Sequence, residues 1–313
     1  MSEELTIEDI INNLLKTEMD KITNSSLFES YLITKNFKKI HSGMKWAEGP
    51  CYIKEHKKLY FSDIPNNQLL SWDGKNVKIE MNPSNFINGN TEDLNYNLIS
   101  CSHGGRCVYK TDKNGKTEIV ANEYLGKKLN SPNDVVVKSD GTIWFTDPNY
   151  GIMSDYEGYK ADMEYGGCYV FRFDPKDSSL TVVSKDFIKP NGIAFSVNED
   201  KLYIADSAGS HDINASSHIK VYDVVEGQFL ENKKIFYKFN PFFSDGFRVD
   251  KDDNVWTSAG KGIKCINPEG EVIGQLLLPD LVANLTFGGE DSNILYVTAS
   301  SNLYSMELNQ QGK

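Results

Sequence analysis

The 313-residue sequence predicts an all-β fold, namely a six-bladed β-propeller of four-stranded blades. The first observation is a repeat, in which a polar residue, a short apolar strand, an Asp/Asn/Gly-rich turn and an aromatic-rich strand recur six times. The second is the spacing of 39 to 58 residues between successive polar residues, near the roughly 40 to 50 residues of one blade. These six polar residues, called anchors below, are Glu48, Asn88, Asn133, Asn191, Asp245 and Asn284.

The segment before the repeats, residues 1–36, has a different pattern. Apolar residues recur there at helical spacing and acidic residues lie near its start, which predicts a short amphipathic helix. The apolar positions are Ile7, Ile10, Ile11, Leu14 and Leu15. We expect this helix to pack on the propeller, with a dimer contact or a partner helix as the alternative. The chain then divides into an N-terminal helical segment, 1–36, and a catalytic propeller domain, 37–313.

Each copy of the repeat predicts two antiparallel strands joined by a tight turn. The clearest copies are PNDVVVKSDGTIWFTD at 132–147 and PNGIAFSVNEDKLYIAD at 190–206. Further strand-like sequence follows each pair, such as GCYVFRFDP and SLTVVSKDF, and completes four strands per blade. The other copies begin at Ala47, Ile87, Ser244 and Ala283.

The last blade shows only three strands, within LTF, ILYVTAS and NLYSMEL, before the chain ends. The segment FKKIHSG, residues 37–43, precedes the first anchor where every other blade has its outer strand. We expect it to supply the missing strand and close the ring. Closure would remove the exposed sheet edges that promote aggregation.

Composition argues against several classes of partner and location. The net charge of −11, spread along the chain, disfavours binding to a nucleic-acid backbone. No run approaches the roughly 18 apolar residues of a membrane span, and the first twenty residues lack the basic start and apolar core of a signal peptide. The five cysteines lie far apart with no CxxC pair, which is typical of reduced, buried thiols in a cytoplasmic protein.

Four anchors predict a metal site. The innermost strands of a propeller run along its channel, so residues at equivalent strand starts converge around one axis. Glu48, Asn133, Asn191 and Asp245 offer two carboxylates and two amides, hard oxygen ligands that suit one divalent cation, Ca²⁺ or Mg²⁺ above all. The alternative is that Asn and Asp only cap turns; Glu48, a poor turn former in the same register, favours the ion. Zn²⁺ and Mn²⁺ are not excluded.

Other polar and aromatic residues are candidates for contacts with a substrate. Asn88 and Asn284 are expected at the mouth of the site, although Asn90 competes with Asn88 for that register. The candidate substrate-binding residues, Asn133 counted in both roles, are Asn133, Asn88, His103 and Tyr150. His211 lies in a similar loop, and each loop residue has a structural alternative, such as Tyr150 packing over the turn at Pro148.

A cation in this site would polarise a carbonyl or phosphoryl oxygen as charge develops on it. We expect Asp245 to be the catalytic carboxylate, as a general base toward water or as the nucleophile, with Glu48 as the competing candidate. The sequence contains no GxSxG elbow, P-loop, GxGxxG fingerprint or HExxH motif, which disfavours serine-hydrolase, nucleotide-dependent and zinc-protease chemistry.

These motifs resemble those of the senescence marker protein/gluconolactonase family, six-bladed propellers of calcium- or zinc-dependent lactonases and related esterases. The resemblance spans about residues 40–305. The long third-blade string looks like the bacterial gluconolactonase branch. The strings that carry the resemblance are WAEGP, FSDIPNNQLLSWDG, LNSPNDVVVKSDGTIWFTDPNYGI, PNGIAF, DGFRVD and ANLTFGG.

The resemblance implies a metal held by a glutamate, two asparagines and an aspartate at strand starts, which match Glu48, Asn133, Asn191 and Asp245. It also implies lactone hydrolysis assisted by the aspartate that Asp245 matches. Where the animal branch carries an arginine two residues before the asparagine matched by Asn133, this chain has Ser131.

Three functions follow as hypotheses. The first is a lactonase that acts on a small lactone or ester, such as the aldonolactone gluconolactone, as a monomer or homodimer. The second keeps the metal and hydrolyses phosphotriesters, as fluorophosphatases of the same architecture do. The third is a non-catalytic propeller that binds a ligand while the ion braces the channel.

Overall fold

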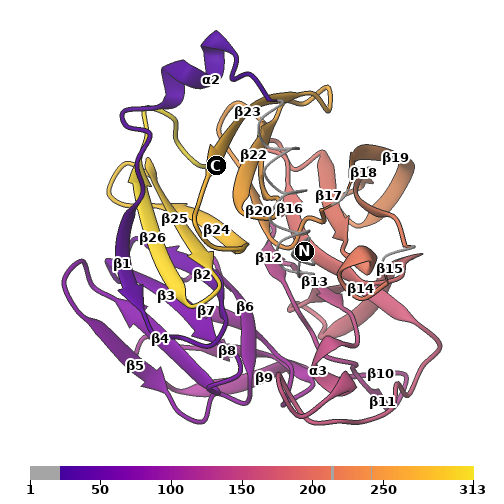
Figure 1. Cartoon of the computed structure of the whole chain (residues 1–313). Coiled ribbons are helices and arrows are strands. Elements are labelled where there is room, and N and C mark those ends of the chain that lie inside the picture. Colours follow the sequence, from indigo (N-terminus) through magenta and orange to yellow (C-terminus); the bar gives the residue numbers. More distant parts are fainter. Residues whose placement is uncertain (1–21, 213–214, 241) are drawn as a thin grey trace, which may run out of the picture.

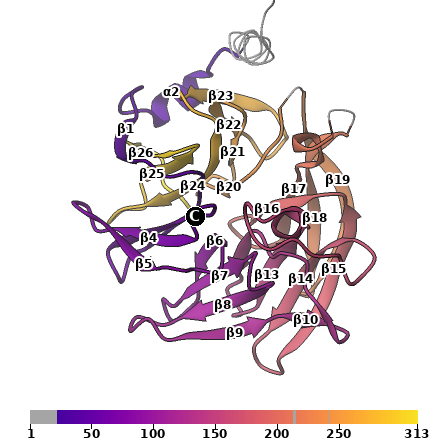
Figure 2. The same ribbon diagram turned by 60° about the horizontal axis from the view of Figure 1, so that its bottom comes forward.

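The computed structural model describes residues 22–212, 215–240 and 242–313. Six antiparallel four-stranded sheets lie around a central axis, which confirms the predicted propeller (Figures 1 and 2). The first strand of each sheet contacts the first strands of both neighbouring sheets, so these six strands form the inner wall of the ring. No helix of the described chain is long and apolar enough to cross a membrane.

The first three blades follow one another in chain order. Blade 1 consists of β2 (Ala47–Ile53), β3 (Lys58–Asp63), β4 (Gln68–Trp72) and β5 (Val77–Met81). Blade 2 consists of β6 (Ile87–Glu92), β7 (Leu98–Ser102), β8 (Cys107–Thr111) and β9 (Thr117–Ala121). Blade 3 consists of β12 (Val135–Val137), β13 (Ile143–Asp147), β14 (Cys168–Asp174) and β15 (Ser179–Phe187). A small hairpin between blades 2 and 3 contains β10 (Glu123–Tyr124) and β11 (Lys127–Lys128).

The second half of the ring repeats this arrangement. Blade 4 consists of β16 (Pro190–Phe195), β17 (Lys201–Asp206), β18 (Ser217–Val225) and β19 (Phe229–Phe239). Blade 5 consists of β20 (Phe247–Val249), β21 (Val255–Ser258), β22 (Gly262–Ile266) and β23 (Val272–Leu277). Blade 6 consists of β24 (Val282–Gly288), β25 (Ile294–Ala299), β26 (Asn302–Glu307) and β1 (Lys38–Ser42).

The ring is closed as the sequence predicts. Strand β1 pairs antiparallel with β26, with Lys38 opposite Ser305 and Ser42 opposite Asn302. Blade 6 therefore combines one strand from near the start of the chain with three from its end, which pairs the outer edge of β26 and ties the two ends of the ring together.

The described part of the N-terminal segment contains one short helix, α2 (Ser26–Tyr31). Ser25 caps it, because its side-chain oxygen accepts a hydrogen bond from the Phe28 N–H at 3.1 Å. Phe28 is fully buried against Trp256, with ring centroids 5.4 Å apart, and packs where Gly274 leaves room for its ring. The apolar stripe from Ile7 to Leu15 lies outside the described residues.

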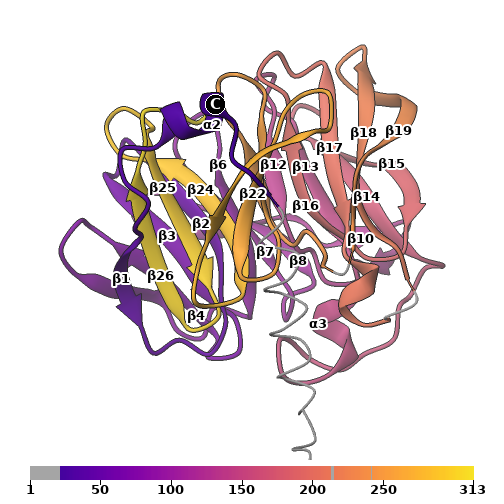
Figure 3. The ribbon, with the colours of Figure 1, turned by 45° about the horizontal axis from the view of Figure 1, so that its top comes forward.

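Two further short helices lie in loops, α3 (Tyr150–Met153) after β13 and the 3₁₀ helix η1 (Ala208–Ser210) after β17. Figure 3 shows α3 at one end of the ring and the C-terminus at the other. The site described next lies at the α3 end, because Tyr150 and Ser210 line it.

Candidate active site

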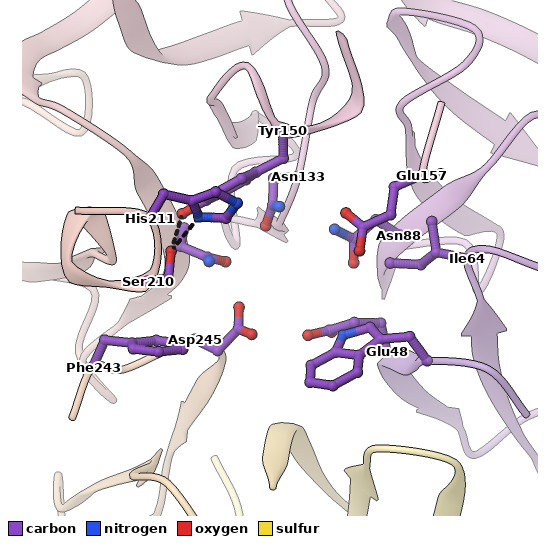
Figure 4. A pocket seen from close by; sticks show the side chains of 12 residues that line it. Glu48, Ile64, Asn88, Asn133, Tyr150, Glu157, Ser210, His211, Phe243 and Asp245 are labelled. Atoms are coloured by element: carbon purple, nitrogen blue, oxygen red, sulfur yellow. Dashed lines mark hydrogen bonds between the residues drawn. The ribbon is translucent and has the colours of Figure 1, made fainter. Parts of the chain in front are cut away.

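A cavity of about 230 Å³ opens at the α3 end of the channel. All four predicted metal ligands line it, and with Asn133 counted in both roles so do three of the four predicted substrate-binding residues (Figure 4). These six residues are Glu48, Asn88, Asn133, Tyr150, Asn191 and Asp245. The structure thus brings together side chains that lie as much as 197 residues apart in the sequence.

Sequence reasoning did not find several residues of the cavity. Ser210 comes from the loop after β17, and Glu157 from the loop after α3. The apolar part of the wall is formed by Trp46, Ile64 and Phe243. No repeat position marks these residues. His211, which follows Ser210 and also lines the cavity, was among the sequence candidates for contact with a substrate.

His103 does not line the cavity, but its ring makes hydrogen bonds to two residues that do, Glu157 and Asn88. Its Nδ1 lies 3.0 Å from the Glu157 carbonyl oxygen, which can only accept, so Nδ1 carries the proton. Nε2 then accepts a hydrogen bond from the Asn88 amide at 3.1 Å. Because this hydrogen bond engages the NH₂ group of Asn88, the side-chain carbonyl oxygen of Asn88 remains available to the cavity. Burial lowers the pKa of His103 to about 4, so the ring is neutral near pH 7.

The competing anchors of blade 2 have different positions. Asn90 is fully buried and donates to Gly49 O and Asn88 O, whereas Asn88 faces the cavity. The structure therefore identifies Asn88, and not Asn90, as the anchor of blade 2. Asn284 does not line the cavity, because its amide donates to Glu48 Oε2 at 3.1 Å.

Bulges and glycines aim the anchors at the axis. The register of β2 shifts just after Glu48, and the shifts in β6 and β16 span the anchors Asn88 and Asn191, whereas that in β24 lies just before Asn284. Such bulges re-aim side chains. Glycine follows four of the six anchors. At Gly49, where φ is +51°, a Cβ would lie 2.0 Å from Asn88 O, so no other residue would let blades 1 and 2 approach this closely.

Buried aspartates hold three of the loops that lead into the anchors. In blades 1, 3 and 4 the second strand ends with an aspartate that accepts hydrogen bonds from the backbone N–H groups two and three residues before the anchor. Asp206, for example, accepts from Ile188 and Lys189 at 2.9 Å each, with a different oxygen for each bond. The three aspartates are Asp63, Asp147 and Asp206, and the anchors they serve are Glu48, Asn133 and Asn191.

The two anchor carboxylates of the cavity, Glu48 and Asp245, lie close enough to affect each other's ionisation. Glu48 is 4% exposed, and burial, followed by the charge of Asp245, raises its pKa well above the usual value. Burial likewise raises the pKa of Asp245 to about 7, although a hydrogen bond from Asn191 opposes the change. A positive charge beside the two acids would offset the cost of ionising them there.

A third buried carboxylate, Asp134, lies next to Asn133 and away from the cavity. It has its own counter-ion, since Arg248 Nη1 lies 3.4 Å from Asp134 Oδ2. The charge of Asp134 further raises the pKa of both Glu48 and Asp245. The channel therefore concentrates negative charge just below the cavity, which favours a cation within it.

The donor set fits a divalent cation. Among the described residues, no group of three or more His, Cys, Asp or Glu side chains is arranged to hold a metal ion. The predicted set is different in kind, because it joins two carboxylates to two amides. The Asn133 amide is only 5% exposed and has no hydrogen-bond partner in the described chain. Oxygen donors with unmet partners suit Ca²⁺ or Mg²⁺.

Another part of the cavity wall comes from the loops after β13 and β17 and is formed by Tyr150, Ser210 and His211. The Tyr150 and His211 rings lie 5.2 Å apart, and Ser210 Oγ lies 2.8 Å from His211 Nδ1. Ser131 braces this wall, because its hydroxyl donates to Pro148 O at 2.7 Å and accepts from Gly151 N at 3.0 Å. Ser131, fully buried, thus orients the loop that carries Tyr150.

Together, the fold and the cavity define a class: six-bladed propellers with a small polar pocket at one end of the channel, lined by carboxylates and amides from successive inner strands. Residues 46–301 match the SMP-30/gluconolactonase/LRE-like region. The chain belongs to this family.

Individual relatives agree with that assignment. A gluconolactonase of Zymomonas mobilis subsp. mobilis is 30% identical over 319 aligned residues, covering 93% of this chain and 87% of the relative. The solved structure of a gluconolactonase from Xanthomonas campestris superposes with a TM-score of 0.85 at 31% identity, covering 92% of this chain and 93% of that one. An X-ray structure provisionally described as a gluconolactonase has a TM-score of 0.86 at 34% identity, covering 92% of this chain and 97% of that one.

Proposed function

We propose that this protein is a lactonase that hydrolyses a small lactone, with an aldonolactone such as gluconolactone as the preferred substrate. The observation that carries the proposal is the convergence of Glu48, Asn133, Asn191 and Asp245 on one cavity of about 230 Å³. This volume is below the roughly 300–1,000 Å³ of pockets that take drug-sized ligands, which favours a small substrate. Family membership and the lactonase names of the relatives support the same reaction.

One divalent cation, Ca²⁺ in our proposal, would be held by the oxygens of Glu48, Asn133, Asn191 and Asp245. When bound it would polarise the lactone carbonyl and neutralise the paired carboxylates. Zn²⁺, Mg²⁺ and Mn²⁺ are compatible with the same donors to different degrees.

Asp245 acts in this proposal as the general base. Its carboxylate takes a proton from water as the water oxygen attacks the carbonyl carbon, and the bond from that carbon to the ring oxygen then breaks. The proton passes to the departing ring oxygen, which leaves a hydroxyl and a carboxylic acid on one open chain. The acid then ionises to a carboxylate and releases the second proton of the water to solvent. Glu48, the competing candidate, is less available for this step because Gly49 N–H and the Asn284 amide already donate to its Oε2 at 2.7 and 3.1 Å.

The remaining polar residues orient the substrate in this proposal. Asn88 presents its carbonyl oxygen to the cavity because His103 takes its NH₂ group. Tyr150 and His211, whose rings are tilted by 43° to each other, form an aromatic part of the wall against which a substrate ring can pack. Asn133, which also lines the cavity, would provide a further polar contact to the substrate.

The test is turnover of D-glucono-δ-lactone, δ-valerolactone and an organophosphate triester, each with Ca²⁺ and with EDTA, after subtraction of spontaneous hydrolysis. We expect proton release from the lactones that depends on the cation, and none from the triester. Turnover of the triester alone would instead identify a phosphotriesterase. If no substrate is consumed while Ca²⁺ raises thermal stability, the protein is a ligand-binding propeller and the proposal is wrong.

We also propose a cytoplasmic location and action as a monomer or homodimer. All five cysteines are free and buried, which is typical of proteins from reducing compartments. Light scattering coupled to size-exclusion chromatography would measure the assembly state, and fractionation of cells would test the location.

A further inference from the structure

Glu157 is the one carboxylate of the cavity that no inner strand provides. It lies in the loop between α3 and β14, and Figure 4 shows its side chain pointing into the cavity on the side of Asn88 and Ile64. Within the described chain, its carboxylate has no hydrogen-bond or ion-pair partner. Glu157 is half-buried, and withdrawing an acid from water without a partner is unfavourable, so a group of this kind is a candidate for binding a ligand.

The loop that carries Glu157 is fixed from both sides. The Glu157 carbonyl oxygen accepts the His103 Nδ1–H bond at 3.0 Å. A Cβ on the next residue, Gly158, would lie 2.0 Å from Gly151 O, so the loop is packed tightly onto α3. Further along, the Tyr159 ring packs edge-on against Phe86 at 5.3 Å. The carboxylate is therefore presented by a braced loop and is preorganised for its ligand.

Glu157 is not part of a three-acid metal cluster with Glu48 and Asp245. A cation shared by all three would require their side chains to form one group, and no group of three or more acidic, histidine or cysteine side chains that could hold a metal exists in the described residues. Glu157 lines the same cavity, and its charge acts on Asp245 less than burial and the Asn191 hydrogen bond do.

An ionised carboxylate is only an acceptor, so its natural partners in this cavity are O–H or N–H groups of the substrate. Hydrogen bonds from a hydroxyl to a carboxylate are short and about twice as strong as those between neutral groups, and its two oxygens can serve two neighbouring hydroxyls. A site of this kind also discriminates against an analogue that lacks the hydroxyl, because the buried acceptor then stays unpaired.

We infer that Glu157 is a specificity residue, which accepts hydrogen bonds from the hydroxyl groups of a polyhydroxylated lactone and selects it over a lactone with an unsubstituted ring. This inference rests on the proposed lactonase function and deepens it. In this arrangement the anchor residues of the blades carry out the hydrolysis, and the loop after α3 determines which substrate is accepted.

The test compares Glu157→Gln with a control, Glu164→Gln, at a solvent-exposed position of the same loop where the glutamate pairs with Arg106. For each variant, kcat and KM are measured on D-glucono-δ-lactone and on δ-valerolactone, which has the same six-membered ring without hydroxyls. We expect Glu157→Gln to lower kcat/KM for the hydroxylated lactone by about 10- to 100-fold, mainly through KM. Turnover of δ-valerolactone should change less than about twofold, and Glu164→Gln should change neither.

Equal losses on both lactones, or no loss on either, would overturn the inference. So would a large drop in Ca²⁺ affinity of Glu157→Gln in calorimetry, which would make Glu157 a cation ligand. If the wild-type protein opens neither lactone, the proposed function fails separately. Binding of D-gluconate to wild type and Glu157→Gln, measured by calorimetry, then still decides whether Glu157 recognises hydroxyl groups: weaker binding to the variant supports it, and equal or absent binding refutes it.

Discussion

Replacing Asp245 with asparagine should make the metal-free protein more stable while it removes the activity. Asparagine keeps the shape of the side chain and still offers an oxygen to the Asn191 amide, but carries no charge. In the absence of a cation, the wild-type protein must bury the Asp245 charge near the acids Glu157, Asp134 and Glu48. The variant avoids this, and it also loses the carboxylate that we propose as the general base.

The structure sets the size and the pH range of the effect. The pKa of Asp245 is raised from 3.8 to about 7. At roughly 1.4 kcal/mol per pH unit, this corresponds to an upper bound of about 4 kcal/mol. Because the folded-state pKa lies above the unfolded one, the destabilisation is absent below pH 3.8, grows as the pH rises, and is complete above about pH 7. We expect Asp245→Asn to gain about 1–4 kcal/mol at pH 8 in EDTA and nothing near pH 4.

The assay is urea unfolding at pH 4, 6 and 8 in EDTA, repeated at pH 8 with Ca²⁺. Calcium should stabilise the wild type and have little effect on the variant. The control is Asp250→Asn, since Asp250 is fully buried and accepts hydrogen bonds from Asn254 N and Trp256 Nε1 far from the cavity. That variant should lose stability at pH 8. An Asp245→Asn protein that is less stable than wild type in EDTA at pH 8 would refute the electrostatic reasoning.

Three other substitutions test separate parts of the structure. Asp206→Asn places an NH₂ group against a backbone N–H, so we expect a loss of about 1–3 kcal/mol and weaker Ca²⁺ binding in calorimetry; unchanged affinity would show that the loop before Asn191 needs no such support. His103→Ala frees the Asn88 amide and should raise KM without changing Ca²⁺ affinity, and an unchanged KM would contradict the role of Asn88. Phe28→Ala should cost about 3–5 kcal/mol in urea unfolding with kcat and KM intact, whereas altered kinetics would link α2 to the cavity.

The repeat made the fold and the inner wall of the cavity predictable. A propeller places equivalent residues of successive blades around one axis, so counting along the chain was enough to bring Glu48, Asn133, Asn191 and Asp245 together. The closing strand followed from the same count, because one blade lacked a strand and an unassigned one lay before the first anchor. The division at residue 36 and the chemical roles of the four ligands stay predictions.

Counting residues along the repeat did not identify the inward-facing residue where a strand is irregular. The register of β6 shifts between Ile87 and Asn90, so alternation along the strand does not tell whether Asn88 or Asn90 faces the axis. The aspartates that hold the anchor loops were visible as the last letters of FSD, FTD and IAD. Their role was not, because a hydrogen bond to a backbone N–H leaves no mark on the identity of the residue that donates it.

The outer wall was beyond sequence reasoning for a different reason. Glu157 has no counterpart in the other blades, and its position depends on a histidine of blade 2, 54 residues earlier, that binds its carbonyl oxygen. Loop residues of this kind are free to differ between proteins that share the same anchors, because changing them leaves the inner strands and their hydrogen bonds intact. If Glu157 selects hydroxylated lactones, relatives with the same four anchors and an apolar residue in its place should hydrolyse unsubstituted lactones better than aldonolactones. A panel of such relatives, assayed on both ring types, would show whether hydrolysis and substrate choice are carried by separate parts of this fold.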